Sequence, residues 1–318
     1  MTSAPLAVYV DQVSKAFKSE KNSVQALDNI SLSVNRGELF GIIGPDGAGK
    51  TTLFRILTTL MLADSGLAQV DGLDTKQQFR EIRKRVGYMP GKFSLYQDLT
   101  VEENLSFFAT LFNTTIEENY DLVKDIYRQI EKFKKRRAGA LSGGMKQKLA
   151  LSCALIHRPS VLFLDEPTTG VDAVSRTEFW ELLRNLQAEQ ITIVVSTPYM
   201  DEASLCDRVA LIQKGKILAV DTPDKLTQLF NRPLFAVRSS NMFELMLDIK
   251  KLNLAAFCYP FGQYHHVVWN ENISETQAVE KLRLNGHPDL ISHRIAPNIE
   301  DCFIDLMNKE TTLAKAVI

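Results

Sequence analysis

The amino-acid sequence predicts an α/β fold followed by a smaller α+β domain. Two short apolar runs, residues 38–43 and 161–164, have the composition of strands buried on both faces of a parallel sheet. The first run leads through glycines into a stretch that can continue as a helix, and the second ends in two carboxylates. With 318 residues the chain is long enough for about two domains. We place them at residues 1–230 and 231–318.

Before and between these runs the pattern changes along the chain. Apolar residues alternate across residues 6–34, which predicts strands of an antiparallel sheet. We predict two further core strands, at residues 86–90 and 191–197. Residues 92–157 are mostly helical in pattern, and Thr100 with Glu103 forms a capping box. The basic run Lys132–Arg137 lies in this region. We expect a solvated helix face there, with a docking surface for an acidic loop or lipid head groups as the alternative.

The second domain alternates strands and helices, which is typical of a small α+β domain. Its predicted elements are a strand at 234–237, a helix at 242–251, strands within 255–269, a helix at 275–284 and a last helix at 299–307. His265 and His266 are adjacent in one predicted strand, so their side chains face opposite ways and cannot share a metal. We interpret them as structural.

Composition excludes several classes of protein. The formal net charge of −1 gives no indication of nucleic-acid binding. No apolar run approaches the roughly 20 residues that span a bilayer, and the first residues do not have the pattern of a signal peptide. The four cysteines are scattered, with no C-x-x-C pair, which is typical of reduced thiols in a cytosolic protein.

The segment after the first apolar run fits G-x-x-x-x-G-K-[ST], a loop that surrounds the phosphates of a nucleotide. Glycines let successive backbone N–H groups point inward, and the following helix N-terminus adds partial positive charge. Lys50 is expected to reach the β- and γ-phosphates, and Thr51 to bind Mg²⁺. The segment comprises Gly44, Pro45, Asp46, Gly47, Ala48, Gly49, Lys50, Thr51 and Thr52.

Asp165 and Glu166 end the second apolar run. A buried strand that ends in carboxylates presents them at the carboxyl edge of the sheet, where ligands collect in α/β folds. Asp165 is placed to hold Mg²⁺, and Glu166 to orient or deprotonate the attacking water. Alone, the pair could equally cap a turn before Pro167. The phosphate loop upstream favours the catalytic interpretation.

A second anion-binding pattern opens an amphipathic helix. Ser142 is a good N-cap, and the glycines after it expose the helix N-terminus. One chain with one phosphate loop has no need of a second such site, unless this one completes a nucleotide site on another subunit. The segment comprises Leu141, Ser142, Gly143, Gly144 and Met145.

Over about residues 6–230 the chain resembles the ATP-binding subunit of an ABC transporter. The motifs that carry the resemblance are the phosphate loop, Leu-Ser-Gly-Gly-Met, Leu-Asp-Glu-Pro-Thr and Asp172. The resemblance implies a P-loop NTPase core with a mixed sheet and flanking helices, an antiparallel β subdomain and a helical subdomain at about 92–157 that touches the permease. It implies ATP and Mg²⁺ as cofactors, with Thr51 and Asp165 as Mg²⁺ ligands.

The family also implies a head-to-tail pair of subunits, in which each ATP lies between one phosphate loop and the partner's signature. By position, Phe17 matches the aromatic residue that stacks on adenine, and Glu166 the catalytic carboxylate. The signature at residues 141–145 reaches across the pair, and Asp172 matches the aspartate loop between the subunits.

Two positions depart from the family pattern. A glutamine usually follows the strand at 86–90, and Gly91 stands there; a histidine usually follows the strand at 191–197, and Pro198 stands there. Gln97, six residues further on, is not an obvious substitute. Losing one transition-state donor typically costs about 10²–10³ in rate. The resemblance therefore implies a weakened hydrolytic site beside a complete signature, which favours a heterodimer with a second ATP-binding subunit over a homodimer.

The leading hypothesis is an ATPase subunit that powers a separate membrane permease, cytoplasmic and peripheral on the inner face of the membrane. The chain also resembles exporter ATPases of the ABC-2 type, in particular the first ATPase half of tandem exporters. This resemblance lies in the particular sequence of the phosphate loop, in the Thr-Pro-Tyr-Met segment and in residues 297–303. The alternatives are an importer ATPase with a C-terminal regulatory domain and a nucleotide-binding regulatory subunit without turnover. DNA-repair and ribosomal ABC ATPases are disfavoured, since the chain has neither a coiled-coil insertion nor a second ATPase core.

Overall fold

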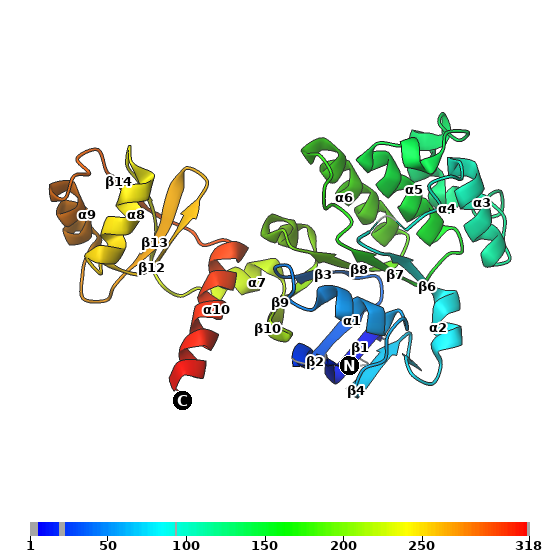
Figure 1. Cartoon of the computed structure of the whole chain (residues 1–318), viewed down its shortest axis with the longest axis horizontal. Helices are drawn as coiled ribbons and strands as arrows, with labels where there is room; N and C mark the ends of the chain where they lie inside the picture. The colour runs from blue at the N-terminus through cyan, green and yellow to red at the C-terminus, as the bar shows by residue number, and fades with distance from the viewer. Residues whose placement is uncertain (1–5, 19–22, 93, 317–318) are drawn as a thin grey trace. The chain divides into compact units, whose positions relative to one another are not determined.

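The computed structural model describes residues 6–18, 23–92 and 94–316 and divides the chain into two compact units, Met1–Pro223 and Asp224–Ile318 (Figure 1). The division falls before the boundary expected at residue 230. Phe230 packs with Leu234, Val268 and Cys302, and the Cys302 thiol contacts the Thr227 carbonyl at 3.6 Å. Phe230 therefore belongs to the core of the second unit, and Thr227 contacts that unit, in agreement with the division at Pro223.

A six-stranded sheet forms the centre of the first unit, in the order β10-β9-β3-β8-β7-β6. All neighbours are parallel except β10, which pairs antiparallel with β9. The residues of β3, β7 and β8 are buried throughout, as the continuous apolar runs predict. The strands are β3 Leu39–Ile43, β6 Val86–Met89, β7 Val161–Asp165, β8 Thr192–Thr197, β9 Arg208–Gln213 and β10 Lys216–Asp221.

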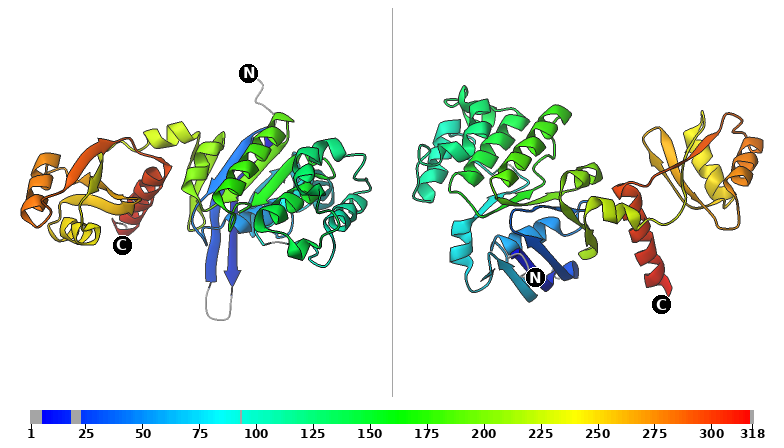
Figure 2. Two further views of the ribbon diagram at one scale, coloured as in Figure 1. Left: turned by 90° about the horizontal axis from the view of Figure 1, so that it is seen from above. Right: turned by 180° about the vertical axis from the view of Figure 1, so that it is seen from behind.

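The alternating N-terminal pattern forms an antiparallel sheet in the order β2-β1-β4-β5, as predicted. Figure 2 shows β1 and β2 as a long ribbon that extends beyond the core. Buried residues of this sheet share one hydrophobic core with α1 (Lys50–Leu57) and with the core sheet, where Phe54 meets the ring of Phe163 edge-on. The strands are β1 Leu6–Lys18, β2 Ser23–Asn35, β4 Ser65–Val70 and β5 Leu73–Asp74.

Helices on the other side of the core sheet include α6 (Ala173–Ala188) and the helical subdomain, opposite α1 in Figure 1. Thr100 caps α3 with the predicted reciprocal bonds to Glu103. The remaining elements of this unit are α2 Phe79–Arg85, α3 Val101–Leu111, α4 Tyr120–Glu131, η1 Ala138–Ala140, α5 Gly143–Leu155 and η2 Met200–Leu205, with α7 Pro223–Gln228 at the division.

The basic run is not a helix face, which corrects the expectation from sequence. Residues 132–137 form turns after α4 ends at Glu131. The carbonyl groups of Lys134 and Arg136 accept hydrogen bonds from the first N–H groups of α3, those of Glu102 and Val101, each at 3.0 Å. Because a helix N-terminus leaves its first donors unpaired, these bonds hold the run against α3 and out of helical geometry.

The second unit is an α+β domain with a four-stranded sheet in the order β12-β13-β11-β14. The predicted helices at 242–251 and 275–284 have the expected bounds, while β14 was not predicted and the last helix is longer than expected. The elements are β11 Leu234–Arg238, α8 Met242–Lys251, β12 Ala255–Phe261, β13 Tyr264–Trp269, α9 Glu275–Leu284, β14 Ile291–Ile295 and α10 Ile299–Ala316. No helix within the described ranges has both the length and the apolar character needed to cross a membrane.

Asp301 anchors the start of α10 to the sheet of this unit. It is fully buried and accepts hydrogen bonds from the Tyr259 hydroxyl and from the backbone N–H of Asn298, and it lies 2.7 Å from Nδ1 of His266. Burial raises the pKa of Tyr259 well above its ordinary value, and the bond to Asp301 raises it further. The neighbouring His265 instead bonds the Met242 carbonyl at 2.7 Å, so the two histidines have separate structural partners.

We predict that Asp301→Ala destabilises the second unit by about 3 kcal/mol, because it removes the partner of the buried His266 and of the half-buried Tyr259 hydroxyl. The chain has two tryptophans. In a Trp180→Phe background, Trp269 of β13 therefore reports urea unfolding of this unit by fluorescence. Glu271→Ala removes an exposed carboxylate of the same unit and serves as the control. An unchanged Trp269 midpoint in Asp301→Ala would contradict the anchoring role.

Candidate nucleotide-binding site

The loop between β3 and α1 requires glycine at both of its ends for steric reasons. A Cβ on Gly44 would lie 2.1 Å from the Ile212 carbonyl oxygen, and a Cβ on Gly49 2.5 Å from that of Ala26. Gly49 also has φ +107°, a conformation that side chains with a Cβ rarely adopt. The loop is therefore held closely between neighbouring backbones, with its shape set by steric exclusion.

Lys50, the first residue of α1, folds back over this loop. Its Nζ donates to the carbonyl oxygens of Gly44 at 2.8 Å and Pro45 at 3.1 Å, and it lies 3.1 Å from Oε1 of Glu166. The side chain of Lys50 is only 3% exposed. The structure thus brings the loop lysine and the second carboxylate of β7 into direct contact. Thr51 and Thr52 are half-buried in the first turn of the same helix.

Asp165 and Glu166 take different backbone paths at the end of β7. Asp165 is the last strand residue and accepts a hydrogen bond from the Ser196 hydroxyl at 2.6 Å. Glu166 has φ +51°, and its N–H is held by the carbonyl of Ser196 at 3.0 Å. A left-handed conformation costs a non-glycine residue roughly 1–2 kcal/mol, and such strain is concentrated at functional sites. Burial raises the pKa of the adjacent Tyr88 to about 12, and the charge of Asp165 adds to that.

The two unusual positions both lie at this site. A Cβ on Gly91 would lie 3.0 Å from the Asp165 carbonyl oxygen and 3.7 Å from Cβ of Glu166. Pro198 follows Thr197, whose carbonyl accepts the N–H of Gly44 at 3.3 Å. Gln97 instead packs in the helical subdomain, where its carbonyl accepts the N–H of Gly139 at 2.9 Å. Geometry therefore gives no support to Gln97 as a replacement for a side chain at position 91.

The Leu-Ser-Gly-Gly-Met segment lies beside the start of α6. Leu141 is buried, and the Ser142 hydroxyl caps α5 by accepting the N–H of Met145 at 3.4 Å. A Cβ on Gly144 would lie 2.9 Å from the Ser175 hydroxyl, and a Cβ on Gly143 3.7 Å from the Gly170 carbonyl oxygen. The close approach of Ser175 explains Gly144 without reference to a ligand, whereas a Cβ on Gly143 would make only an ordinary contact.

Asp172 and Phe17 occupy the remaining predicted positions. Asp172 caps α6, and the hydrogen bond from the Ser175 N–H lowers the pKa of its carboxyl group. Phe17 is 43% exposed on β1, where it pairs with Val24. The predicted residues therefore form two clusters: Lys50 with Glu166 at the phosphate loop, and residues 141–145 with the start of α6.

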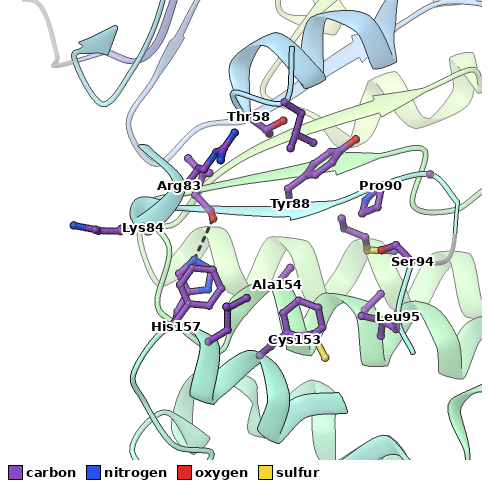
Figure 3. Close-up of a pocket in the computed structure, with 18 of the residues that line it drawn as sticks. Thr58, Arg83, Lys84, Tyr88, Pro90, Ser94, Leu95, Cys153, Ala154 and His157 are labelled. Carbon is purple, nitrogen blue, oxygen red and sulfur yellow. Dashed lines mark hydrogen bonds between the residues drawn. The ribbon is translucent and has the colours of Figure 1, made fainter. Parts of the chain in front are cut away.

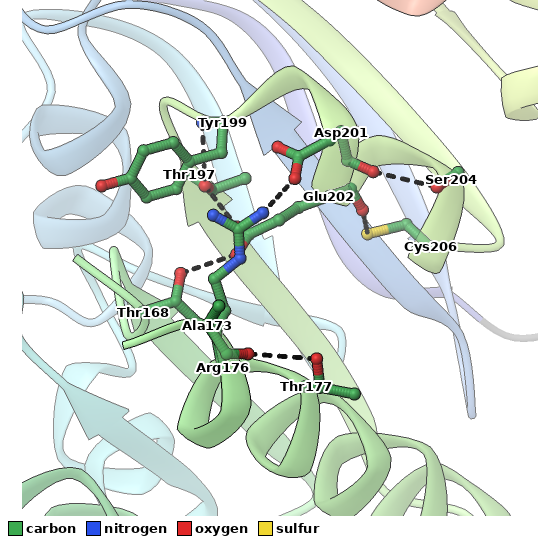
Figure 4. A network of polar contacts seen from close by, with 10 residues as sticks. All are labelled: Thr168, Ala173, Arg176, Thr177, Thr197, Tyr199, Asp201, Glu202, Ser204 and Cys206. Carbon is green, nitrogen blue, oxygen red and sulfur yellow. Dashed lines mark hydrogen bonds and ion pairs between the residues drawn. The ribbon is translucent and has the colours of Figure 1, made fainter. Parts of the chain in front are cut away.

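Two features of the first unit were not found from sequence. One is a cavity of about 800 Å³ between β6, α2 and the helices α3 and α5 (Figure 3). Tyr88 and Pro90 line one wall and Cys153 and Ala154 the other. Gly91 also lines the cavity. The second is a buried polar cluster around Glu202, which follows β8 (Figure 4). Neither has a short sequence motif, because both are assembled from distant segments.

Comparison with known proteins agrees with this geometry. Residues 27–169 match the family model described as ABC transporter. The chain is 40% identical over 321 residues to the daunorubicin resistance ATP-binding protein DrrA2 of Streptomyces coeruleorubidus, a match that covers 95% of this chain and 96% of that protein. The chain belongs to the ATP-binding proteins of ABC transporters, and its first unit has the fold of an ABC-type ATPase.

Two further similarities extend the comparison. The probable multidrug ABC transporter ATP-binding protein YbhF of Escherichia coli is 41% identical over 203 residues, which cover 63% of this chain but 35% of YbhF. The chain thus spans about a third of the length of that relative. A dimeric structure of the ATP-binding cassette MJ0796 bound to ADP and Pi superposes with a TM-score of 0.62 at 26% identity, covering 68% of this chain and 98% of the cassette.

We predict that Gly49→Ala lowers ATP affinity at least ~10-fold, since the clash with the Ala26 carbonyl must displace the loop that carries the N–H donors. Gly262→Ala is the matched control: its φ is +56°, but a Cβ there meets nothing within 4 Å, and it lies in the second unit. Titration with a fluorescent ATP analogue measures both. Equal affinity of Gly49→Ala and wild type would show that the loop tolerates the displacement.

Proposed function

We propose that this chain is an ATP-binding and ATP-hydrolysing subunit that powers a separate membrane permease, with export as the direction of transport. The observation that carries the enzymatic part is the contact of Lys50 with Glu166 at the mouth of a sterically defined phosphate loop. The names of the relatives, among them a daunorubicin resistance protein and a probable multidrug transporter protein, support export. The first unit, Met1–Pro223, serves as the nucleotide-binding domain and the second unit, Asp224–Ile318, as an accessory domain.

In this proposal, backbone N–H groups of residues 44–52 bind the phosphates and Lys50 neutralises the β- and γ-phosphate charge. Thr51 and Asp165 present the hard oxygen donors that Mg²⁺ requires, so the residues present fit the ion. Bound Mg²⁺ would supply neutralisation of phosphate charge. Phe17, exposed on β1, offers its ring face to adenine. Glu166 orients the attacking water and accepts its proton.

The second cluster serves a partner subunit. Ser142 and Asp172 are exposed, and the α5 N-terminus offers backbone donors to an anion. The related cassette MJ0796 is described as a dimer bound to ADP and Pi, which supports a paired arrangement. We propose a second ATP-binding subunit of different sequence as the partner, because Gly91 and Pro198 weaken only the site built on this chain's own phosphate loop.

We predict that the purified chain binds ATP but turns it over no faster than its Glu166→Gln variant. Gly91→Gln with Pro198→His supplies the two missing side chains beside Asp165 and Gly44, and we expect turnover to rise at least ~10-fold. Steady-state phosphate release at saturating ATP with Mg²⁺ measures both, with ATP affinity determined in parallel.

Two outcomes would count against parts of this proposal. Clear Glu166-dependent turnover by the wild-type chain would show that its site is competent and would remove the argument for an unlike partner. Absent turnover in the double substitution, with ATP binding intact, would favour a regulatory subunit without hydrolysis, the alternative that Gly91 and Pro198 themselves suggest.

The cavity beside Gly91 is the surface proposed to receive the permease. Its walls are largely apolar, with Phe108 and Leu111 of α3 on one side and Arg83 and Lys84 of α2 at the rim. An apolar groove with a cationic rim fits an amphipathic helix that carries acidic residues at one end. Docking there would hold the chain at the inner face of the membrane.

We predict that Leu111→Glu abolishes association with the permease, since it places a charge on a wall that a partner would bury. Leu111 is 60% exposed, so the substitution leaves the fold intact. Leu67→Glu, an exposed leucine of β4 outside the cavity, is the control. Sedimentation with membranes of the source cells measures association. Equal sedimentation of the two variants would contradict docking at this groove.

A further inference from the structure

Glu202 is a fully buried carboxylate that joins three segments of the first unit (Figure 4). Its Oε1 accepts a hydrogen bond from the Thr168 hydroxyl at 2.8 Å, and its Oε2 accepts one from the Thr197 hydroxyl. Nε of Arg176 lies 3.2 Å from Oε1. A buried charge is stable only when paired and hydrogen-bonded, so these contacts are mutually dependent.

Arg176 is itself held in a fixed orientation. Its guanidinium group also pairs with Asp201, and its Cζ lies 4.9 Å from the centroid of the Tyr199 ring. Both partners come from the segment that follows β8. The planar guanidinium can contact two carboxylates at once in a defined geometry, which a lysine cannot do. We call Arg176, Glu202, Thr168 and Thr197 the clasp.

The clasp connects elements to which the proposed function gives different roles. Thr168 lies two residues after Glu166, and Thr197 lies immediately before Pro198. Arg176 is in the first turns of α6, the helix that Asp172 caps. The same helix is tied to the signature helix α5 by a 2.7 Å ion pair between Lys148 and Glu178. One buried carboxylate thus fixes the ends of β7 and β8 relative to α6.

We infer that Glu202 is a positioning residue: it holds the 166–172 loop, and with it the carboxylate of Glu166, in register with the β8 end and with α6. The inference rests on the proposed function, since the loop matters for turnover only if Glu166 acts on ATP. Among the residues that the structure describes, the carboxylate of Glu202 bonds Thr168, Thr197 and Arg176 and no residue of the phosphate loop. It therefore acts through these residues and not on the substrate.

The test compares Glu202→Gln with Glu38→Gln. Glu38 is also a buried carboxylate paired with an arginine, Arg208. It directly precedes β3 and so lies at the amino end of that strand, away from the end that carries the site. Hydrogen–deuterium exchange of the full chain is measured over residues 166–173, 197–205 and 50–57. We expect Glu202→Gln to raise exchange in residues 166–173 and 197–205 and to leave exchange in α1 unchanged. Glu38→Gln should leave exchange unchanged in residues 166–173 and 197–205.

A kinetic readout separates positioning from general loss of structure. In the most active form available, wild type or Gly91→Gln with Pro198→His, Glu202→Gln should lower kcat about 10-fold while ATP affinity changes less than about 2-fold. Arg176→Met should act in the same direction. The double variant Arg176→Met with Glu202→Gln should have a kcat no lower than that of either single variant, because both substitutions remove the same interaction.

The inference would be overturned by unchanged exchange over residues 166–173 in Glu202→Gln. It would also be overturned if exchange in α1 rose equally and ATP affinity fell in parallel, since that pattern indicates loosening of the whole unit. If no form of the chain hydrolyses ATP, the proposed hydrolytic function fails. The exchange comparison still decides whether Glu202 positions the loop.

Discussion

Parallel pairing of β3, β8 and β7 is the constraint on which the site depends. The register sets Ile43 opposite Thr197 and Asp165 opposite Ser196, so three strands end at one level of the sheet. The loops that follow these three strands therefore lie close together. Lys50 contacts Glu166 at this end of the sheet. At the end of β8 the Ser196 hydroxyl donates to Asp165 and the Thr197 hydroxyl donates to Glu202.

Much of this could be predicted from sequence, because the decisive residues lie close together along the chain. The strand, the glycines and Lys50 are contiguous, and so are the apolar run and its two carboxylates. Thr100 with Glu103, and the bounds of α8 and α9, follow from local capping and periodicity. The basic run was misjudged because its geometry depends on carbonyl groups that bond to α3, a partner some 30 residues away in the sequence.

The features that sequence could not reveal are those in which a residue's neighbours decide its role. Glu202 looks like an ordinary acidic residue after a strand, and only the fold places Thr168 and Arg176 around it. Asp301 lies in the segment 297–303, for which sequence gave only a resemblance, and its burial against Tyr259 and His266 shows that the segment has a structural role. Such roles depend on contacts across the chain and not on spacing within it.

Gly91 has a consequence for selective inhibition. It lines the cavity on one side and faces the backbone of Asp165 on the other, with no side chain between them. A small molecule bound in the cavity beside Gly91 would contact the backbone at the end of β7, next to Asp165 and Glu166. A glutamine at this position would present a different surface to the same molecule.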